Sequence, residues 1–269
     1  MKLLFEILFR EPSKIIRFKN YLKFLIFVLF YSGKKRYTKT KVNLYGKSII
    51  VPDTLSFVWQ FHEIFVEQYY KFNTTNSKPI ILDCGANIGL SALYFKMLFP
   101  NSDIYAFEPD NNIFECLKNN INSFGLKDVT LIKKAVWIHN EGVKFFSEGA
   151  DGSSIFSDKA DKLVESVSLK EFIVGIDREI DFLKMDIEGA EVEVIKDCDT
   201  CLNKIKNLFI EYHAFVNSEQ QLDVILKILT KNGFRYFIKP EADRRMPYIN
   251  RINKNFSNVD LQLNIFAYK

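Results

Sequence analysis

The chain has 269 residues, of which 48% are hydrophobic and 26% are charged. This length and composition exclude a largely disordered chain and predict one elaborated domain, or one domain with an appendage. Residues 1–41 contain 11 Lys/Arg and 2 Asp/Glu, a net charge of +9, whereas the other residues contain 26 Lys/Arg and 31 Asp/Glu, a net charge of −5. The sequence therefore predicts a basic arm on a mildly acidic body.

The basic arm, residues 1–41, contains the aromatic-rich apolar segment YLKFLIFVLFYSGKKR at residues 21–36. A bilayer span requires about 20 apolar residues, roughly twice the length of this run. A secretory signal also fits poorly, because no small-residue cleavage site follows the apolar run. Two interpretations stay open: a helix on an anionic membrane surface, or a helix packed on the body. We predict a cytoplasmic protein that is at most peripheral on the membrane.

The four cysteines are Cys84, Cys116, Cys198 and Cys201, and only the last two are close in sequence. A zinc site would need a second pair or suitably spaced histidines, and none lies nearby. We therefore expect free thiols in a reducing compartment.

An appendage is predicted between the arm and the main domain. Residues 42–52 (VNLYGKSIIVP) indicate a β-hairpin with Gly46 in its turn, and residues 53–72 indicate a helix. The polar break NTTNSK at 73–78 then marks a boundary, so the expected units are residues 1–41, 42–78 and 79–269.

From Ile80 onward, strand and helix patterns alternate. Strands are expected at 80–83, 103–108, 129–137, 181–186, 208–214, 235–240 and 261–269, with helices at 89–99, 111–124, 191–197 and 218–233. Asp110 and Gly125 are expected to cap one helix, and Ser218 with Gln221 to form a capping box for the last. This alternation predicts an α/β fold: a mostly parallel sheet covered by helices on both faces, with ligands at the carboxyl edge of its strands.

The stretch LDCGANIGLS joins the first of these strands to a helix. The dinucleotide fingerprint G-x-G-x-x-G is absent, because Asn87 stands where the second glycine should be. Asp83 at the strand end would repel a pyrophosphate but attract an ammonium or a sulfonium. The spacing of Asp83, Gly85, Asn87 and Gly89 therefore suits a nucleoside that carries a cationic amino-acid tail.

Two further positions fit such a nucleoside. Glu108 closes the next strand, 25 positions after Asp83, where a carboxylate can accept hydrogen bonds from both ribose hydroxyls. Ala135 and Val136 follow the third strand and could line an adenine slot, although core packing is an equal alternative.

Four motifs together resemble the FkbM family of S-adenosylmethionine-dependent methyltransferases: Gly85 to Gly89, Glu108-Pro109, KMDIEGAE at 184–191 and IEYH at 210–213. The resemblance covers about residues 79–213. It implies a class I, Rossmann-like methyltransferase that uses S-adenosylmethionine and acts on hydroxyls of natural products or glycans. It also implies a functional cluster of Asp186, Glu188 and Glu191.

We therefore interpret the chain as an O-methyltransferase acting on a hydroxyl, with a sugar of a glycan, glycolipid or natural product as the acceptor. The loop Asn/Asp-Pro-Pro-aromatic, typical of nucleobase methylation, is absent, so no nucleic acid partner is expected. Two alternatives remain: a nicotinamide-dependent oxidoreductase on the same kind of sheet, or a non-catalytic membrane-associated scaffold.

The general base is expected at the ends of two neighbouring strands, at Asp186 or His213. Histidine, with a pKa near 6.5, is a stronger base than aspartate near 3.9. His213 is thus the predicted base, with Asp186 orienting the substrate or the imidazole beside the cofactor. Glu188 joins the catalytic set, although Glu188 and Glu191 in the first turn of a helix could simply stabilise that helix.

No metal is predicted, although Asp186, Glu188 and Glu211 could hold a hard divalent cation. Residues 148–162 are rich in glycine and serine, which suits a flap over the substrate with Ser153 and Ser154 near the cofactor; a plain surface loop is the alternative.

Overall fold

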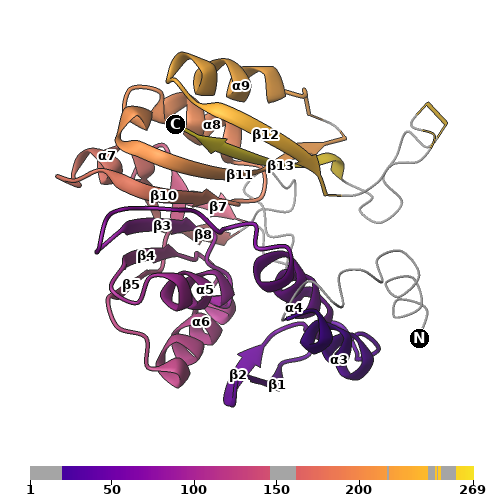
Figure 1. Ribbon diagram of the computed structural model, residues 1–269. Helices are drawn as coiled ribbons and strands as arrows, with labels where there is room; N and C mark the ends of the chain where they lie inside the picture. Colours follow the sequence, from indigo (N-terminus) through magenta and orange to yellow (C-terminus); the bar gives the residue numbers. More distant parts are fainter. Residues whose placement is uncertain (1–19, 146–161, 217, 242–245, 247, 250–258) are drawn as a thin grey trace.

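The computed structural model describes residues 20–145, 162–216, 218–241, 246, 248–249 and 259–269 (Figure 1). Its centre is a seven-stranded sheet in the order β12-β13-β11-β10-β3-β4-β5. These strands are β3 (Ile80–Cys84), β4 (Asp103–Phe107), β5 (Val129–Ile132), β10 (Ile180–Met185), β11 (Ile205–Phe215), β12 (Arg235–Pro240) and β13 (Val259–Tyr268).

The five strands from β5 to β11 are parallel, and β13 runs antiparallel to both β11 and β12. Strand β3 lies between β4 and β10, so the strand order reverses there. Ligands of such sheets bind at the carboxyl ends of the strands beside that reversal. The predicted α/β fold with a mostly parallel sheet is confirmed.

Helices cover both faces of this sheet (Figure 1): α5 (Leu90–Leu98) and α6 (Asn111–Phe124) on one, and α7 (Leu169–Val174), α8 (Glu191–Cys198) and α9 (Leu222–Lys231) on the other. Successive side chains of a strand point to opposite faces. Accordingly, Phe182 of β10 belongs to the core beneath α5 and α6, and Leu183 to the core beneath α8 and α9.

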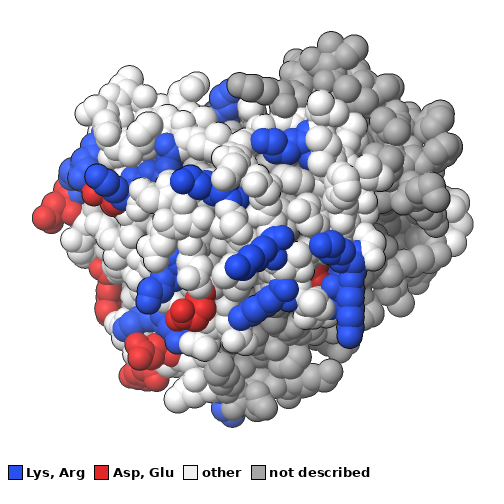
Figure 2. All heavy atoms as spheres, turned by 90° about the horizontal axis from the view of Figure 1, so that it is seen from below, with Lys and Arg blue, Asp and Glu red and all other residues white. Residues whose placement is uncertain are grey.

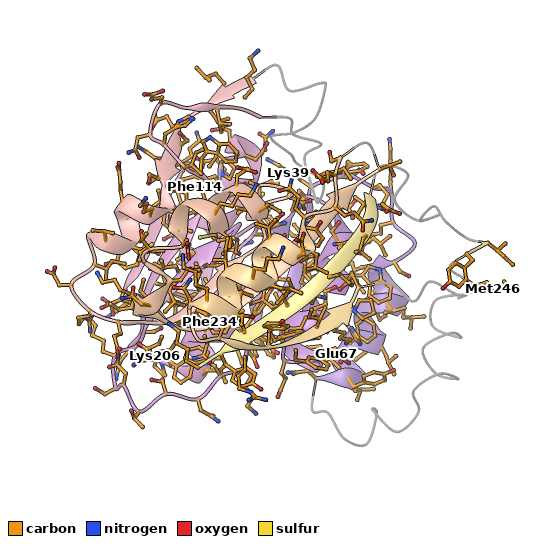
Figure 3. The ribbon with its side chains drawn as sticks, turned by 90° about the horizontal axis from the view of Figure 1, so that it is seen from above. Lys39, Glu67, Phe114, Lys206, Phe234 and Met246 are labelled. Atoms are coloured by element: carbon orange, nitrogen blue, oxygen red, sulfur yellow. The ribbon has the colours of Figure 1, made fainter. Side chains whose placement is uncertain are left out.

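Helix α3 (Tyr21–Tyr31) lies in the arm, and the appendage comprises a hairpin of β1 (Thr40–Leu44) and β2 (Lys47–Val51), α4 (Thr54–Phe61) and a π-helix η1 (His62–Val66). Its apolar residues form one continuous core with α5, α6 and the sheet. The helix expected over residues 53–72 is shorter than predicted: it changes to π geometry at His62 and ends at Val66. Figure 3 shows Glu67, just after η1, beside the edge of the sheet, where its carboxylate lies 3.5 Å from Lys239 Nζ of β12.

The break NTTNSK is fixed to the sheet rather than free. Asp181 of β10 is fully buried and accepts hydrogen bonds from Thr74 Oγ1 (2.8 Å), Asn76 Nδ2 (2.9 Å) and the backbone N–H of Ile80 (3.1 Å). A buried carboxylate needs such donors, so this residue joins the appendage to the first strand of the main domain.

The local predictions have mixed outcomes. Asp110 caps α6 through two backbone N–H groups, and Gly125 ends it in the left-handed conformation, as expected. The capping box at Ser218 and Gln221 is wrong, because α9 has no side-chain cap and the N–H of Gln221 donates to the hydroxyl of Tyr212 instead. All four cysteines are free, as predicted, and all four are buried.

Two short strand pairs lie outside the main sheet: β6 (Ala135–Trp137) with β9 (Ser166–Ser168), and β7 (Val143–Phe145) with β8 (Lys162–Val164). Within the part of the chain that the structure describes, no helix is long and apolar enough to cross a bilayer.

Candidate active site

The turn between β3 and α5 depends on two glycines. Gly85 has φ +82°, and a Cβ added there would lie 1.9 Å from the carbonyl oxygen of Asp186. Gly89 has φ +86°, and its added Cβ would lie 2.8 Å from Leu117 Cδ1 of α6. Only glycine meets both requirements, a left-handed backbone and close packing. The predicted turn therefore lies against the end of β10.

Glu108 holds this turn from the neighbouring strand. Its Oε2 accepts the backbone N–H of Asn87 at 3.1 Å, and its Oε1 accepts the N–H of Asp110 at 2.9 Å. Burial raises the pKa of Glu108 to about 8, and the two N–H donors oppose that rise. The predicted ribose acid thus stands beside the glycine turn at the carboxyl edge of the sheet.

The sequence suggested that Asp83 contacts the ligand, but its side chain is fully buried behind the turn. Its Oδ2 accepts the hydroxyl of Ser91 at 2.5 Å, and its Oδ1 lies 3.8 Å from Lys184 Nζ. Burial raises the pKa of Asp83, although Lys184 and Ser91 oppose this rise. An apolar environment disfavours an unpaired carboxylate, so Lys184 is its partner across the sheet.

Lys184 also reaches the turn itself. Its Nζ donates to the carbonyl of Gly85 at 2.7 Å and to Asp186 Oδ2 at 3.2 Å. Burial lowers the pKa of Lys184, but Asp186 and Asp83 more than offset this and raise it above its ordinary value. This buried ammonium therefore links the glycine turn to the predicted catalytic strand.

The two residues expected to line an adenine slot do not lie on a continuation of the third strand of the main sheet. Ala135 and Val136 lie on β6, which pairs with β9 and does not continue β5. Val136 packs in the core beneath α8, whereas the backbone N–H of Ala135 donates to the carbonyl of Glu165 at 2.8 Å. Ala135 remains a predicted cofactor contact. The predicted flap with Ser153 and Ser154 falls on residues 146–161, outside the described residues.

His213 forms a buried pair with Glu191. Its Nδ1 lies 3.2 Å from Glu191 Oε1, and its side chain is 3% exposed. Glu191, which is fully buried, also accepts the backbone N–H groups of Ile187 (3.1 Å) and Gly189 (3.0 Å). Because these groups can only donate, the carboxylate oxygens are acceptors and Nδ1 is the donor toward Glu191. Glu191, rather than Asp186, therefore orients the imidazole.

The loop before α8 brings Glu188 toward the same histidine. Glu188 has φ +56°, Gly189 has φ +102°, and a Cβ on Gly189 would lie 2.4 Å from Phe215 Cε2. The helix begins only at Glu191, so Glu188 is not in its first turn, contrary to the sequence expectation. Instead, Glu188 Oε2 lies 3.7 Å from His213 Nε2. A left-handed backbone at a residue other than glycine, as at Glu188, is the kind of strain found at functional sites.

The charge of His213 is set by these acids. Burial lowers the pKa of His213, but the carboxylates of Glu188, Glu191 and Glu211 more than offset this and raise it well above its ordinary value. Glu211 Oε1 lies 3.7 Å from His213 Nε2. Burial and the neighbouring charge of Asp186 in turn raise the pKa of Glu211 well above the usual range.

Two more carboxylates face this cluster from distant segments, and no sequence motif marks either of them. Burial, together with the charges of Glu241 and Glu211, raises the pKa of Glu63 well above its ordinary value. Glu63 comes from η1 and Glu241 follows β12, so only the fold unites them. Within the described residues, Asp186, Glu211 and His213 have potential metal-ligating atoms within 4.8 Å of one another, a set that includes His213 in place of the expected Glu188.

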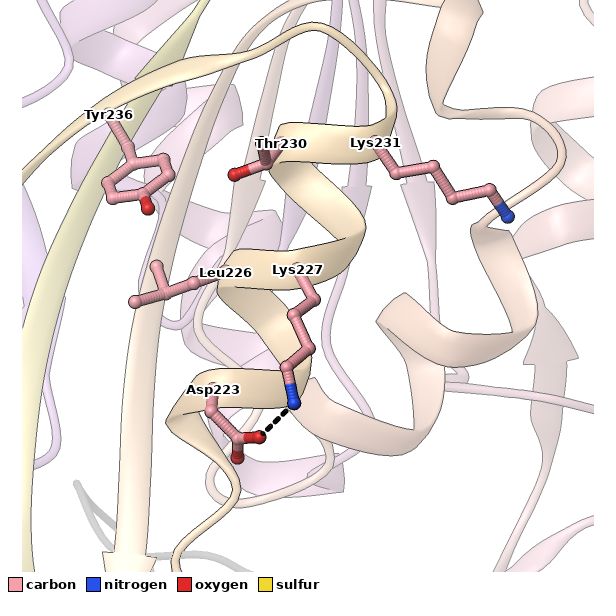
Figure 4. A pocket seen from close by; sticks show the side chains of 6 residues that line it. All are labelled: Asp223, Leu226, Lys227, Thr230, Lys231 and Tyr236. Atoms are coloured by element: carbon pink, nitrogen blue, oxygen red, sulfur yellow. Dashed lines mark hydrogen bonds and ion pairs between the residues drawn. The ribbon is translucent and has the colours of Figure 1, made fainter.

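A depression of about 540 Å³ lies elsewhere, on the outer side of α9 (Figure 4). It is lined by Asp223, Leu226, Lys227, Thr230, Lys231 and Tyr236. Asp223 pairs with Lys227 one turn further along α9 at 2.8 Å. None of its lining residues belongs to the glycine turn or to the cluster around His213. We place the active site at the carboxyl edge of β3, β4, β10 and β11, because the glycine turn, Glu108, Asp186 and His213 all lie there.

A sheet with this reversal, glycine turn and acid on the second strand defines a nucleoside-binding α/β enzyme. The Methyltransferase FkbM domain matches residues 83–236, more than half of the chain. The chain therefore belongs to the FkbM methyltransferase family and is an S-adenosylmethionine-dependent methyltransferase. The nicotinamide-dependent alternative is thereby set aside.

Similar proteins have been described in several organisms. The methyltransferase sdnD of Sordaria araneosa is 29% identical over 206 residues, 62% of this chain and 79% of that protein. The 2-O-methyltransferase NoeI of Sinorhizobium fredii is 27% identical over 54% of this chain and 65% of its own. The hexuronic acid methyltransferase AglP of Haloferax volcanii is 22% identical over 60% and 68%, respectively. A solved structure, methyltransferase FkbM from Methylobacillus flagellatus, aligns over 95% of this chain and 60% of its own, with 15% identity and a TM-score of 0.48.

The residues at the carboxyl edge fit the S-adenosylmethionine that this family uses. Gly85 and Gly89 leave no Cβ where the turn is closest to its neighbours, and Glu108 offers carboxylate oxygens to hydroxyl donors. Asp83 Oδ1 is buried without a hydrogen-bond donor, and Lys184 Nζ lies 3.8 Å from it, so this ion pair supports the turn from behind.

Proposed function

We propose that this methyltransferase acts on a hydroxyl group, and that the acceptor is a sugar of a glycan, glycolipid or natural product. The observation that carries the proposal is the pair of His213 and Glu191 near the end of β11, at the carboxyl edge of the sheet, with β10 between it and the strand that leads into the glycine turn. The relatives NoeI and AglP, named for 2-O-methylation and for a hexuronic acid, support a sugar hydroxyl.

In this proposal His213 is the general base. With its Nδ1–H donating to Glu191, the neutral imidazole has its lone pair on Nε2, which can take the proton of the acceptor hydroxyl. Bound S-adenosylmethionine supplies the methyl group. Asp186, whose Oδ2 lies 3.2 Å from Lys184 Nζ, is beside the turn and orients the acceptor or the cofactor. The carboxylate of Glu188, with Oε2 3.7 Å from His213 Nε2, stabilises the imidazolium that forms.

The acidic surroundings of His213 support a particular pH dependence. Because the pKa of His213 is raised, the imidazole in the free protein keeps its proton to a higher pH than an exposed histidine does, and a protonated imidazole cannot accept a proton. Deprotonation as the pH increases makes the base available, so kcat/KM should rise through the raised pKa of His213.

The test uses isotope-labelled S-adenosylmethionine with sugar acceptors such as uronic acids and methyl glycosides. His213→Ala should lower turnover by at least about 100-fold while S-adenosylhomocysteine binding changes little. His139, which is in another part of the chain and contacts Trp137, provides the matched control His139→Ala. Full activity of His213→Ala would reassign the base to Asp186, and methyl transfer to no hydroxyl acceptor would favour a non-catalytic scaffold.

A further inference from the structure

Helix α3 is apolar on two opposite faces, and the described residues of the chain cover only one of them. Tyr21, Phe24, Phe27 and Val28 are buried against α4 and η1, with ring centroids 4.9 Å apart for Phe27 and Phe61. The other face holds Leu22, Ile26, Leu29 and Phe30, which are 62%, 46%, 61% and 65% exposed. The spacing of these four residues is that of one helix face.

The surroundings of this second face are strongly basic. Between residues 20 and 52 the chain has seven Lys/Arg and no Asp/Glu. Lys34, Lys35 and Arg36 follow the helix after Ser32 and Gly33 and are exposed, and Arg36 Nε also donates to Asp53 Oδ2 at 2.7 Å. Figure 2 shows the underside of the molecule, where α3, β1 and β2 lie, with Lys and Arg spread across it and Asp and Glu gathered toward one side.

We propose that this face of α3, comprising Leu22, Ile26, Leu29 and Phe30 with the basic residues 34–36, docks on an anionic lipid bilayer. Large exposed apolar side chains next to a basic cluster are what an interfacial helix presents to such a surface. A helix of 11 residues is about 16 Å long, roughly half of a bilayer core, so it lies in the plane of the membrane while its other face stays on the protein.

A second copy of the chain fits this face less well. A symmetric contact places the same patch of both copies together, so Lys34, Lys35 and Arg36 of one copy would approach those of the other. Like charges at such a contact oppose association, whereas the phosphates of an anionic bilayer attract them. Charge complementarity therefore selects the bilayer.

The experiment is sedimentation of the full chain with vesicles of phosphatidylcholine alone or with about 30% phosphatidylglycerol. We expect binding to the anionic vesicles that weakens with salt, because screening shortens the range of the attraction. The double variant Ile26→Glu, Phe30→Glu should bind at least about tenfold more weakly than the control Met97→Glu, Val174→Glu, which adds the same charge at exposed positions on α5 and α7. Lys34→Ala and Lys35→Ala should each weaken binding about fivefold.

Circular dichroism and S-adenosylhomocysteine affinity establish that each variant is folded. Equal binding of both double variants, or wild-type binding that is the same on neutral and anionic vesicles, overturns the proposal. A dimer in sedimentation that dissociates in Ile26→Glu, Phe30→Glu, without vesicle binding by the wild type, would assign the face to a second copy instead.

Discussion

Replacing Glu191 by glutamine is the sharpest test of the pair at the centre of the site. The change keeps the shape of the side chain but removes its charge, and it turns one oxygen into a donor. Glu191 is fully buried and receives N–H groups from Ile187 and Gly189 and the Nδ1 of His213. In the variant at least one of these donors must face the new amide N–H₂.

The expected cost can be worked from these contacts. Loss of one hydrogen bond to a charged group costs about 1.5 to 3 kcal/mol. The attraction between unit charges at the observed 3.2 Å amounts to about 1 kcal/mol with the dielectric constant of water and about 5 kcal/mol with an effective value of about 20. Breaking a buried pair by removing one partner costs about 3 to 5 kcal/mol. We therefore expect Glu191→Gln to lower the free energy of unfolding by about 3 kcal/mol at pH 6.

The assay is urea unfolding followed by circular dichroism between pH 5 and 9, with Glu188→Gln as the control. Glu188 also lies beside His213, at 3.7 Å, but its side chain is 29% exposed, so its loss should cost less than about 1 kcal/mol. The pKa of His213 is higher in the folded than in the unfolded chain, where it is near 6.5. Its stabilising effect is thus complete below that unfolded value and is lost as the pH rises through the folded pKa.

Glu191→Gln should flatten this pH dependence and lower turnover, while Glu188→Gln leaves most of the stability. A Glu191→Gln protein within about 0.5 kcal/mol of the wild type at pH 6, with unchanged turnover, would refute the assigned role of Glu191.

Three further outcomes follow from the cofactor side and the acid cluster. Gly85→Ala should abolish S-adenosylhomocysteine binding in calorimetry, because the added Cβ would lie 1.9 Å from a backbone oxygen. The control Gly46→Ala has a similar φ of +81° but open space around its Cβ, so it should cost only about 1 to 2 kcal/mol of stability. Normal binding by Gly85→Ala would contradict this prediction. If ribose hydroxyls donate to Glu108, the dissociation constant should fall as the pH rises toward about 8, and binding below that pH should release a proton; a flat profile would remove Glu108 from the ribose site. Because Lys184 and His213 already balance the acids, EDTA should leave turnover unchanged; a loss restored by Mg²⁺ would make Asp186, Glu211 and His213 metal ligands.

Some of the site was readable because its signal is local. The positions of Gly85, Gly89 and Glu108 follow from a strand, a turn and the end of the next strand. The parallel order of the sheet then brings those strand ends to one edge. The capping of α6 by Asp110 and Gly125 is local in the same way. By contrast, the cap expected at Ser218 failed because the hydroxyl of buried Tyr212, from a neighbouring strand, takes the N–H of Gln221.

Partners that cross the sheet could not be read in this way. Asp83 was expected to face a ligand, but Lys184 lies in register with it on the adjacent strand and Ser91 returns from α5. Glu191 was recognised only as a member of a motif. Its role as the partner of His213 depends on the left-handed turn at Glu188 and Gly189, which aims the carboxylate back at β11.

The sequence by itself determined the alternation of strands and helices, the glycine turn, the acid on the second strand and the basic arm, because each depends on neighbours along the chain. Only the tertiary structure decided which acids surround His213, that Glu63 and Glu241 join them, and which face of α3 is covered. Contacts between segments far apart in the sequence set these features, through burial and charge that no local pattern encodes.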